Sequence, residues 1–289
     1  MDPAVTLLRT VLNAASLPAP RTAGRAAFAL FLRPGRRSRV RTTEREVHDR
    51  AVTDELTVNG KRVVVYRWGD GARPVLLVHG WQSRASRFAP FVPRLQALGL
   101  SPVSFDAPGH GDSGGRTTTI LEYREVIRRL QETYGTFDSV IAHSFGVSCA
   151  YLALREGVRA GRLVAVAGVA RFGYLPAAFC ARLGLNGRIE RDLRRRIEQE
   201  LFAGAGDIWE RFDATRDPAA VPLPVLAVHD EDDTVVGIDQ AYRLKAAYGD
   251  RLDLLVTRGL GHRRILADPA VIDNAIGFLA GADLEARTA

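Results

Sequence analysis

The segment Val140-Ile-Ala-His-Ser-Phe-Gly146 is the most informative stretch of the sequence for the fold. It places Ser144 between an apolar run typical of a buried strand and a segment, Phe145 to Arg155, with the pattern of a helix. Ala142 and Gly146, two positions before and after the serine, are small enough for a tight strand-to-helix turn. A serine that only capped the helix would not need small residues on both sides, so the segment predicts an exposed, reactive hydroxyl.

Strand and helix signals alternate on both sides of this turn. Asn59-Gly60 favours a tight hairpin that joins two antiparallel strands at the start of a sheet. The later apolar runs are typical of strands covered on both faces, and helical segments separate them. This order predicts an α/β fold, a mainly parallel twisted sheet with helices on both faces. The predicted parallel strands include Val75–His79, Val103–Asp106, Val140–Ala142, Leu163–Ala167, Val225–Val228 and Leu252–Val256, and the predicted helices include Arg87–Leu98, Thr119–Tyr134, Gln240–Tyr248 and Pro269–Leu279.

The alternation is interrupted after Gly168. Residues 172–217 contain few strand signals and show helical patterning, and Pro218, Pro222 and Pro224 end the segment before the strands resume. We therefore expect a small helical cap inserted into the sheet domain. The predicted division is a helical extension over 1–50, a core over 51–171 and 218–289, and a cap over 172–217.

The composition is that of a globular protein, with 46% hydrophobic and 25% charged residues. The net charge of +7 comes almost entirely from arginine, because Lys61 and Lys245 are the only lysines. Many of the arginines lie in Arg33–Arg45 and Arg188–Arg196. No aromatic residues interleave with these runs as a base-stacking surface would require, so we expect a solvated face and no nucleic-acid partner.

The two cysteines and the N-terminal segment indicate where the protein is located and whether it contacts a membrane. Cys149 and Cys180 are too isolated for a disulfide framework, and the N-terminus has no basic leader, so a cytoplasmic location is expected. The apolar patches Val5–Leu12 and Ala26–Leu32 are too short to span a bilayer. They predict either helices packed on the core or, beside the basic residues, a weak membrane-surface anchor.

A serine hydroxyl is a weak nucleophile and needs a base within hydrogen-bonding distance. His262 follows the last predicted strand in Leu260-Gly261-His262, a short loop that can bring the ring over Ser144. His79 and His110 lie in other turns at the same sheet edge and are expected to fix loops. The remaining histidines, His48, His143 and His229, are expected to be structural.

The strand–serine–helix turn resembles the nucleophile elbow of the α/β-hydrolase superfamily, in its serine hydrolase branch. The usual elbow has glycine where this sequence has Ala142. The segment from Asp230 to Val236 is similar to the family's acid loop, and this resemblance implies Asp233 as the acid, with Asp232 as the alternative. The order Ser144, Asp233, His262 is also the order in that family.

The same resemblance extends to the groups that would stabilise an oxyanion. The N–H of Phe145, directly after the serine, is one expected donor. His79-Gly80-Trp81-Gln82 resembles the family's oxyanion loop, so the Trp81 N–H is implied as the second donor. A substrate pocket is expected under the cap, lined by Trp81, Phe172, Tyr174 and Phe179, and Leu175 and Leu183 also suggest an apolar acyl or alcohol site there. Arginines 188, 191, 194, 195 and 196 could either attract an anionic group or form a solvated helix face.

Two motifs suggest other chemistry. Gly109, Gly111 and Gly114 form a G-x-G-x-x-G pattern, but an apolar helix does not follow, so nucleotide binding is not favoured. The acidic run that begins at Asp230 would need a closing glutamate to hold calcium, and Ala241 stands there. We therefore expect neither a metal nor a cofactor.

The sequence thus predicts a serine hydrolase, carboxylesterase-like, acting on a small acyl ester or thioester through an acyl-enzyme on Ser144. An acyltransferase that uses the same three residues remains an alternative. A non-catalytic ligand-binding protein on the same scaffold is a second alternative. The sequence does not indicate an oligomeric state.

Overall fold

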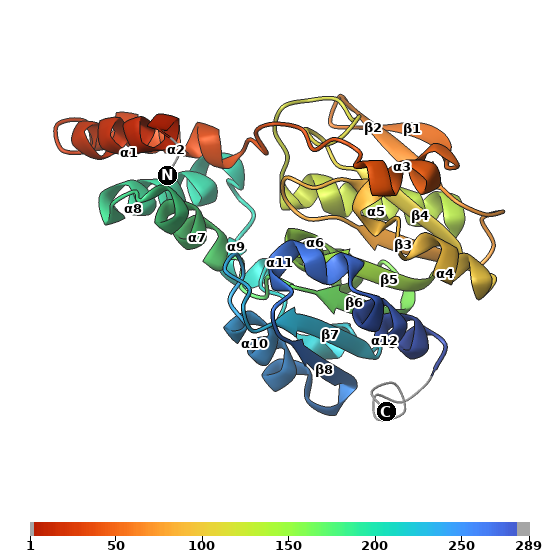
Figure 1. The fold of residues 1–289 in the computed structure, drawn as a ribbon. Coiled ribbons are helices and arrows are strands. Elements are labelled where there is room, and N and C mark those ends of the chain that lie inside the picture. Colours follow the sequence, from red (N-terminus) through yellow and green to blue (C-terminus); the bar gives the residue numbers. More distant parts are fainter. Residues whose placement is uncertain (1–2, 282–289) are drawn as a thin grey trace.

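Eight strands form one sheet in the computed structural model, which describes residues 3–281 (Figure 1). Their order is β1-β2-β4-β3-β5-β6-β7-β8. β2 pairs antiparallel with β1 and β4, and every other neighbouring pair is parallel. The predicted fold class is confirmed. The strands are β1 Val52–Val58, β2 Lys61–Arg67, β3 Pro74–Val78, β4 Ser101–Asp106, β5 Phe137–His143, β6 Ala160–Val166, β7 Val225–Asp230 and β8 Leu252–Thr257.

Helices cover both faces of the sheet because its inner strands bury side chains on both sides. In β3, Leu76 and Val78 belong to one buried hydrophobic cluster, whereas Val75 and Leu77 belong to a second cluster on the opposite face. All five residues of β3 are buried, which explains its unbroken apolar sequence. The helices are α1 Pro3–Ala15, α2 Pro20–Phe31, α3 Thr42–Asp49, α4 Val92–Ala97, α5 Ile120–Tyr134, α6 Phe145–Arg155, α7 Tyr174–Leu183, α8 Gly187–Arg196, α9 Ile208–Arg211, α10 Asp239–Tyr248, α11 Gly261–Arg264 and α12 Pro269–Leu279.

One predicted helix is divided in the structure. The segment predicted as a helix over Arg87–Leu98 forms a 3₁₀ turn, Ala85–Phe88, followed by α4, which begins at Val92. Pro90 and Pro93 lie in this region, and proline lacks the N–H that a continuous helix would use. Proline is tolerated in the first turn of a helix, where the N–H would have no intrahelical partner, so α4 begins just before Pro93.

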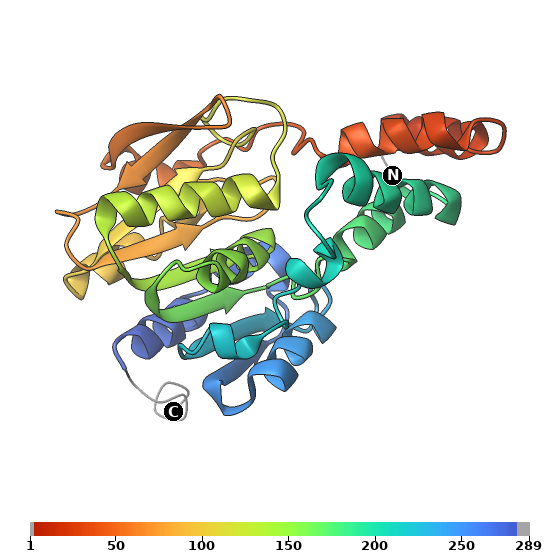
Figure 2. The same cartoon turned by 180° about the vertical axis from the view of Figure 1, so that it is seen from behind.

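The N-terminal helices α1 and α2 lie against α7 and α8, apart from the sheet (Figures 1 and 2). The Asn13 side chain donates to the carbonyl of Gly184 at 2.8 Å and accepts from the N–H of Asn186 at 2.9 Å. A Cβ on Gly24 of α2 would lie 1.9 Å from Oδ2 of Asp192, so α2 and α8 approach closely. We call α1, α2, α7 and α8 together the cap helices.

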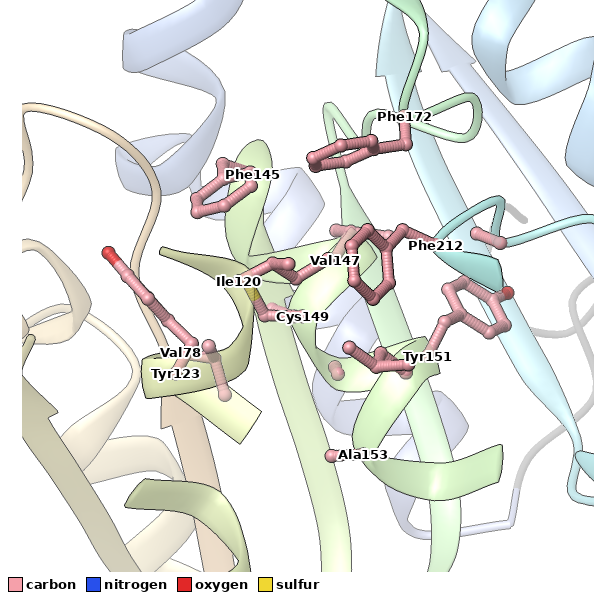
Figure 3. Close-up of a cluster of buried hydrophobic side chains, with 14 of the residues drawn as sticks. Val78, Ile120, Tyr123, Phe145, Val147, Cys149, Tyr151, Ala153, Phe172 and Phe212 are labelled. Atoms are coloured by element: carbon pink, nitrogen blue, oxygen red, sulfur yellow. The ribbon is translucent and has the colours of Figure 1, made fainter. Parts of the chain in front are cut away.

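Helix α6 is the central buried helix, and residues 145–154 are all buried (Figure 3). Tyr123 and Phe145 meet edge to face at 5.4 Å, and Phe172 and Phe212 do so at 5.0 Å. Cys149 lies within this cluster as a free, buried thiol. The strand-to-helix turn that holds Ser144 is therefore supported by packed side chains on several sides.

Gly146 allows the start of α6 to approach β3. A Cβ at this position would lie 2.5 Å from the Val78 carbonyl oxygen and 2.8 Å from that of His79, and backbone atoms of a central strand cannot move aside. We expect Gly146→Ala to lower the free energy of unfolding by about 3 kcal/mol in urea titrations. Gly187→Ala is the matched control, because its Cβ would meet only Nη1 of Arg191 at 3.5 Å. Equal stability of both variants would contradict this account of the contact.

Candidate active site

Ser144 occupies the turn between β5 and α6 in a conformation that few side chains adopt. Its φ is 57° and its ψ is −123°, and its N–H donates to the Val166 carbonyl at 2.9 Å. A Cβ on Gly80 would lie 2.7 Å from the Cβ of Ser144, so the loop after β3 lies directly against the serine. Positive φ values are uncommon for residues other than glycine. Where they occur, the residue often lies at a functional site.

His262 connects Ser144 to Asp233. It lies in α11, which follows β8, and its Nε2 is 3.0 Å from the Oγ of Ser144. Its Nδ1 is 2.7 Å from Oδ2 of Asp233. A carboxylate only accepts, so Nδ1 carries the proton and Nε2 is left as the acceptor for the serine hydroxyl. The three predicted catalytic side chains, which are far apart in the sequence, are thus brought into one hydrogen-bonded chain.

Asp233 is held by the backbone as well as by His262. Its Oδ1 accepts from the N–H of Val235 at 2.8 Å and of Val236 at 2.9 Å. Burial alone raises the pKa of Asp233, but the hydrogen bond and charge of His262 and the two N–H groups outweigh it and leave the pKa below its ordinary value. The group is therefore a carboxylate at neutral pH, as a partner for an imidazolium must be.

The neighbouring acids have other contacts. Oδ2 of Asp232 accepts from the N–H of Gly259 at 2.9 Å. Asp230 accepts from the N–H groups of Leu260 at 3.0 Å and Gly261 at 2.9 Å, and so holds the loop that carries His262. The structure brings Asp233, and not the alternative Asp232, to the imidazole.

His79 and His110 hold the loop next to Ser144. Nδ1 of His79 donates to the carbonyl of Gly80 at 2.8 Å, and its Nε2 accepts from the N–H of Ala107 at 3.0 Å. His110 accepts from the N–H of Gln82 at 3.2 Å. Both rings therefore fix the turn over residues 79–82.

The other histidines also make structural contacts. Nε2 of His143 donates to the carbonyl of His262 at 2.9 Å, and the two ring centroids are 4.8 Å apart. His229 donates to the carbonyl of Val236 at 2.8 Å, beside Asp233. His48 of α3 packs on the Tyr66 ring at 4.8 Å. No sequence motif indicated the contact between His143 and His262, which follows from the position of the His262 loop over the turn that holds Ser144.

Trp81 and Phe145 lie beside the serine, as the sequence predicts. Phe145 is the first residue of α6, and an N–H in the first helical turn has no partner within the helix. Within residues 3–281, neither its N–H nor that of Trp81 makes a hydrogen bond to the protein. Their rings meet edge to face at 5.7 Å. Two residues beside Ser144 therefore carry backbone N–H groups without a partner within the described chain.

An apolar cavity of about 380 Å³ opens next to Ser144. It is lined by Trp81, Phe172, Tyr174, Phe179 and Leu175, all predicted for the substrate pocket. Leu183, also expected there, does not line it and packs against the hydrophobic core instead. The sequence did not identify several others, of which Phe31 and Leu32 from the N-terminal extension are the most distant. The additional lining residues are Phe31, Leu32, Thr118, Thr119, Ile120, Phe145, Val169, Ala178, Ala181, Arg182, Leu201, Phe202, Thr234, Val235 and Val236.

The arginines of α8 do not line this cavity. Arg194 pairs with Glu190 at 3.0 Å, and Asp192 pairs with both Arg195 at 2.6 Å and Arg196 at 2.7 Å. The possibility that these arginines hold an anionic part of a substrate inside the pocket is therefore not supported. The charged residue at the cavity is Arg182 of α7.

The glycine-rich turn after β4 closes on a carboxylate. Oδ2 of Asp106 accepts from the N–H of Asp112 at 2.8 Å, and Oδ1 accepts from the N–H of Ala85 at 2.8 Å. A Cβ on Gly111 would lie 1.8 Å from Oδ2 of Asp106, so glycine is required there. These N–H groups point to Asp106 and are not free for a phosphate.

The described residues contain neither a cluster suited to a metal ion nor a helix suited to crossing a bilayer. No group of three or more His, Cys, Asp or Glu residues within 3–281 is arranged to hold a metal ion. In the same part of the chain, every helix is too short or too polar to cross a bilayer.

A known family model matches most of the chain. Residues 75–275, which include Ser144, Asp233 and His262, match the model of the alpha/beta hydrolase family. The chain belongs to the alpha/beta hydrolase family. A search of curated proteins gives no sequence match to this hydrolase.

Several solved structures share the fold of this alpha/beta hydrolase. Mouse alpha/beta hydrolase domain-containing protein 10 is 16% identical with a TM-score of 0.62, over 83% of this chain and all of the other (100%). An esterase of Pyrococcus furiosus is 20% identical with a TM-score of 0.59, over 81% and 91% of the two chains. A monoacylglycerol lipase of Paleococcus ferrophilus is also 20% identical with a TM-score of 0.59, over 75% and 98%. At these identities, the likeness is one of fold.

The buried histidines of this alpha/beta hydrolase make its stability depend on pH. Burial lowers the pKa of His79 to about 4 and that of His110 and His143 to about 3. In the unfolded chain a histidine has a pKa of about 6.5, so their stabilising contribution is complete above that pH and is lost as the pH falls toward the folded values. We expect the free energy of unfolding to fall from pH 6.5 to pH 4 by up to about 4 kcal/mol per pH unit, about 1.4 from each histidine.

Urea titrations between pH 7 and pH 5 measure this slope. Carboxylates with lowered pKa values, such as Asp233, weaken the fold in the same direction but at lower pH. His110→Gln keeps an acceptor for the Gln82 N–H and removes one titrating group, so its slope should be about a third smaller. A stability that is the same at pH 7 and pH 5 would contradict the assignment of these rings as neutral.

Proposed function

We propose that this hydrolase is a serine esterase that cleaves carboxylic ester or thioester bonds through an acyl-enzyme on Ser144. The observation that carries the proposal is the hydrogen-bonded chain from Asp233 through His262 to Ser144 at the wall of an apolar cavity. A base at 3.0 Å from a serine hydroxyl, held by a carboxylate, is the arrangement that nucleophilic catalysis by serine requires.

In the proposed mechanism, Oγ of Ser144 attacks the carbonyl carbon while Nε2 of His262 takes the hydroxyl proton. Asp233 stabilises the resulting imidazolium, and the N–H groups of Trp81 and Phe145 donate to the oxyanion. His262 then gives the proton to the leaving alcohol or thiol as the carbon–oxygen or carbon–sulfur bond breaks. Water, deprotonated by His262, then attacks the carbonyl carbon of the acyl-enzyme. The bond between this carbon and Oγ of Ser144 breaks, the acid is released, and His262 returns the proton to Oγ. No step requires a cofactor.

The cavity favours an apolar acyl group. Phe172, Phe179 and Leu175 supply much of its lining, and apolar walls reward burial of a hydrocarbon chain. Structures with the same fold include proteins named as an esterase, a monoacylglycerol lipase and a thioesterase domain. We therefore propose small or medium acyl esters or thioesters as substrates, and the sequence-based expectation of a cytoplasmic location stays a prediction.

Labelling and turnover test this proposal. A fluorophosphonate probe should label the full-length chain, and p-nitrophenyl esters of increasing acyl length should be hydrolysed. Ser144→Ala should abolish both. Ser139→Ala is the matched control, because Ser139 is buried on β5, the strand that leads to Ser144, and its hydroxyl has no partner within the described chain. This control should keep labelling and turnover.

Two other functions give different outcomes. An acyltransferase would also be labelled by the probe. When an alcohol acceptor is added at fixed water concentration, it would form more acyl product, because the alcohol accepts the acyl group from Ser144. A ligand-binding protein that only retains the fold would show neither labelling nor turnover. Absence of both in the unmodified chain would overturn the esterase proposal.

A further inference from the structure

The charge of the molecule is concentrated on the cap helices. The segments that contain them, 3–31 and 174–196, hold nine arginines and two acidic residues, which gives +7. The whole chain has 40 basic and 33 acidic residues, also +7, so the remainder holds 31 of each and is neutral. The charge of these segments therefore equals the net charge of the protein, and the rest of the chain taken together has a net charge of zero.

Most of these arginines are not neutralised within the described structure. Acidic residues pair only with Arg194, Arg195 and Arg196 in these helices. The other six make no ion pair within residues 3–281, and five of them are exposed. Those five are Arg21 and Arg25 of α2, Arg182 of α7, and Arg188 and Arg191 of α8, and the sixth is the half-buried Arg9 of α1.

Part of the basic run that directly follows α2 is held by other residues. Arg37 donates to the carbonyls of Gly111 and Gly115, and Arg41 lies 3.7 Å from Glu44. Two of the arginines between positions 33 and 45 are therefore committed to the rest of the protein. Four others in this run, Arg33, Arg36, Arg39 and Arg45, are exposed and make no ion pair within residues 3–281, against five such arginines on the cap helices.

The outer face of α1 is apolar. Leu7 is 66% exposed, Val11 is 54% exposed, and Leu17, just after the helix, is 65% exposed. The other exposed positions between 3 and 18 are uncharged: Pro3, Ala4, Thr10, Ala14 and Pro18. Figures 1 and 2 show α1 at the end of the molecule that is farthest from the sheet. Nothing in the described chain covers this face.

We propose that the cap helices dock on an anionic lipid surface, with α1 inserting Leu7, Val11 and Leu17 and the exposed arginines contacting the headgroups. A helix with an apolar face beside a cluster of cationic side chains has the two features that interfacial binding needs. A nucleic acid would satisfy the arginines but gain nothing from the leucines. A second copy of the chain would cover the leucines. It would also bring together two faces that each carry a net charge of +7, and these faces repel each other.

Docking would involve the wall of the cavity. Helix α2, which carries Arg21 and Arg25, ends at Phe31, and Phe31 and Leu32 line the pocket. The membrane-facing layer and the pocket wall thus share a helix. This link to substrate rests on the proposed function, but the docking itself does not, and the test below does not depend on catalysis.

Vesicle flotation with the full-length chain tests the proposal. The protein should float with vesicles of phosphatidylcholine containing 30% phosphatidylglycerol, and much less with pure phosphatidylcholine vesicles. Each arginine near such a surface contributes about a 5-fold increase in binding, so Arg21→Gln with Arg25→Gln should weaken it about 30-fold. Leu7→Ser with Leu17→Ser should weaken it at least about 10-fold. Salt at 0.5 M should release much of the bound protein.

Matched controls separate this surface from general charge and hydrophobicity. Arg45→Gln with Arg159→Gln removes two exposed arginines outside the cap helices, and Tyr242→Ser removes an apolar side chain that is 51% exposed on α10. Both controls should bind vesicles like the unmodified chain. Ser144→Ala should also bind, so a failed esterase proposal leaves this result readable.

Two outcomes would overturn the proposal. One is equal flotation with neutral and anionic vesicles, or none with either. The other is a dimer in light scattering that Leu7→Ser with Leu17→Ser converts to a monomer, because a second copy would then be the occupant of the α1 face. Melting curves of each variant show that the fold is retained.

Discussion

Alanine in place of His262 is expected to lower kcat for p-nitrophenyl ester hydrolysis by about 10⁶-fold. The imidazole Nε2, at 3.0 Å from Oγ of Ser144, is the group positioned to remove the hydroxyl proton. Without it the serine is a weak nucleophile and the leaving group receives no proton. KM should change little, because the apolar cavity that binds the acyl group is unaltered. Steady-state kinetics with an active-site titrant measure both constants.

The combination of two substitutions makes this prediction more stringent. Groups that act as one unit are not additive, so Ser144→Ala with His262→Ala should be no slower than either single variant. If instead the two losses multiply, the two side chains act separately and the proposed proton transfer between them is wrong. Fluorophosphonate labelling should be lost in all three variants.

Replacing Asp233 with asparagine should lower kcat by about 10⁴-fold. Asparagine keeps the size of the side chain, but its NH₂ can face Nδ1 of His262 and force the proton onto Nε2, which must accept the serine proton. Asp232→Asn is the matched control. Its oxygen can still accept from the N–H of Gly259, so activity should change little.

Kinetics of these two variants in the same ester assay decide between the neighbouring acids. A large loss in Asp232→Asn together with an active Asp233→Asn would show that the 2.7 Å contact between Asp233 and His262 is not the productive one. Unfolding midpoints of both variants distinguish a catalytic loss from a loss of fold.

The elbow was predictable because its determinants are local. The helix expected from Phe145 to Arg155 has those bounds in the structure, and Gly146 is small because β3 lies against it. The apolar runs of the inner strands are also local signals, since each strand is buried on both faces. The fold class follows from such signals together with the order of strands and helices.

The choice between Asp232 and Asp233 depends on less local geometry. Both residues lie in one loop after β7, and the sequence pattern alone left both open. The structure separates them through backbone contacts, since Asp233 accepts from the N–H groups two and three residues onward, and Asp232 reaches across to Gly259.

The walls of the pocket were the least predictable part. Phe31 and Leu32 lie more than a hundred positions before Ser144 in the sequence. The packing of α2 on α8 and of Phe31 on Phe179 of α7 brings them to the cavity. The run Ala26–Leu32 indicated an apolar helix face but not its partner. A contact between two insertions outside the sheet has no periodicity of its own, so sequence patterns do not reveal it.

The backbone at Ser144, with φ of 57°, places one residue under two opposed selective pressures. Glycine would adopt this conformation without strain, whereas a side chain there costs about 1–3 kcal/mol of conformational energy. Evolutionary drift toward a more stable protein would therefore favour glycine at this position and eliminate the nucleophile. A serine kept in this conformation therefore lowers the thermal stability of the protein at the residue that presents the hydroxyl.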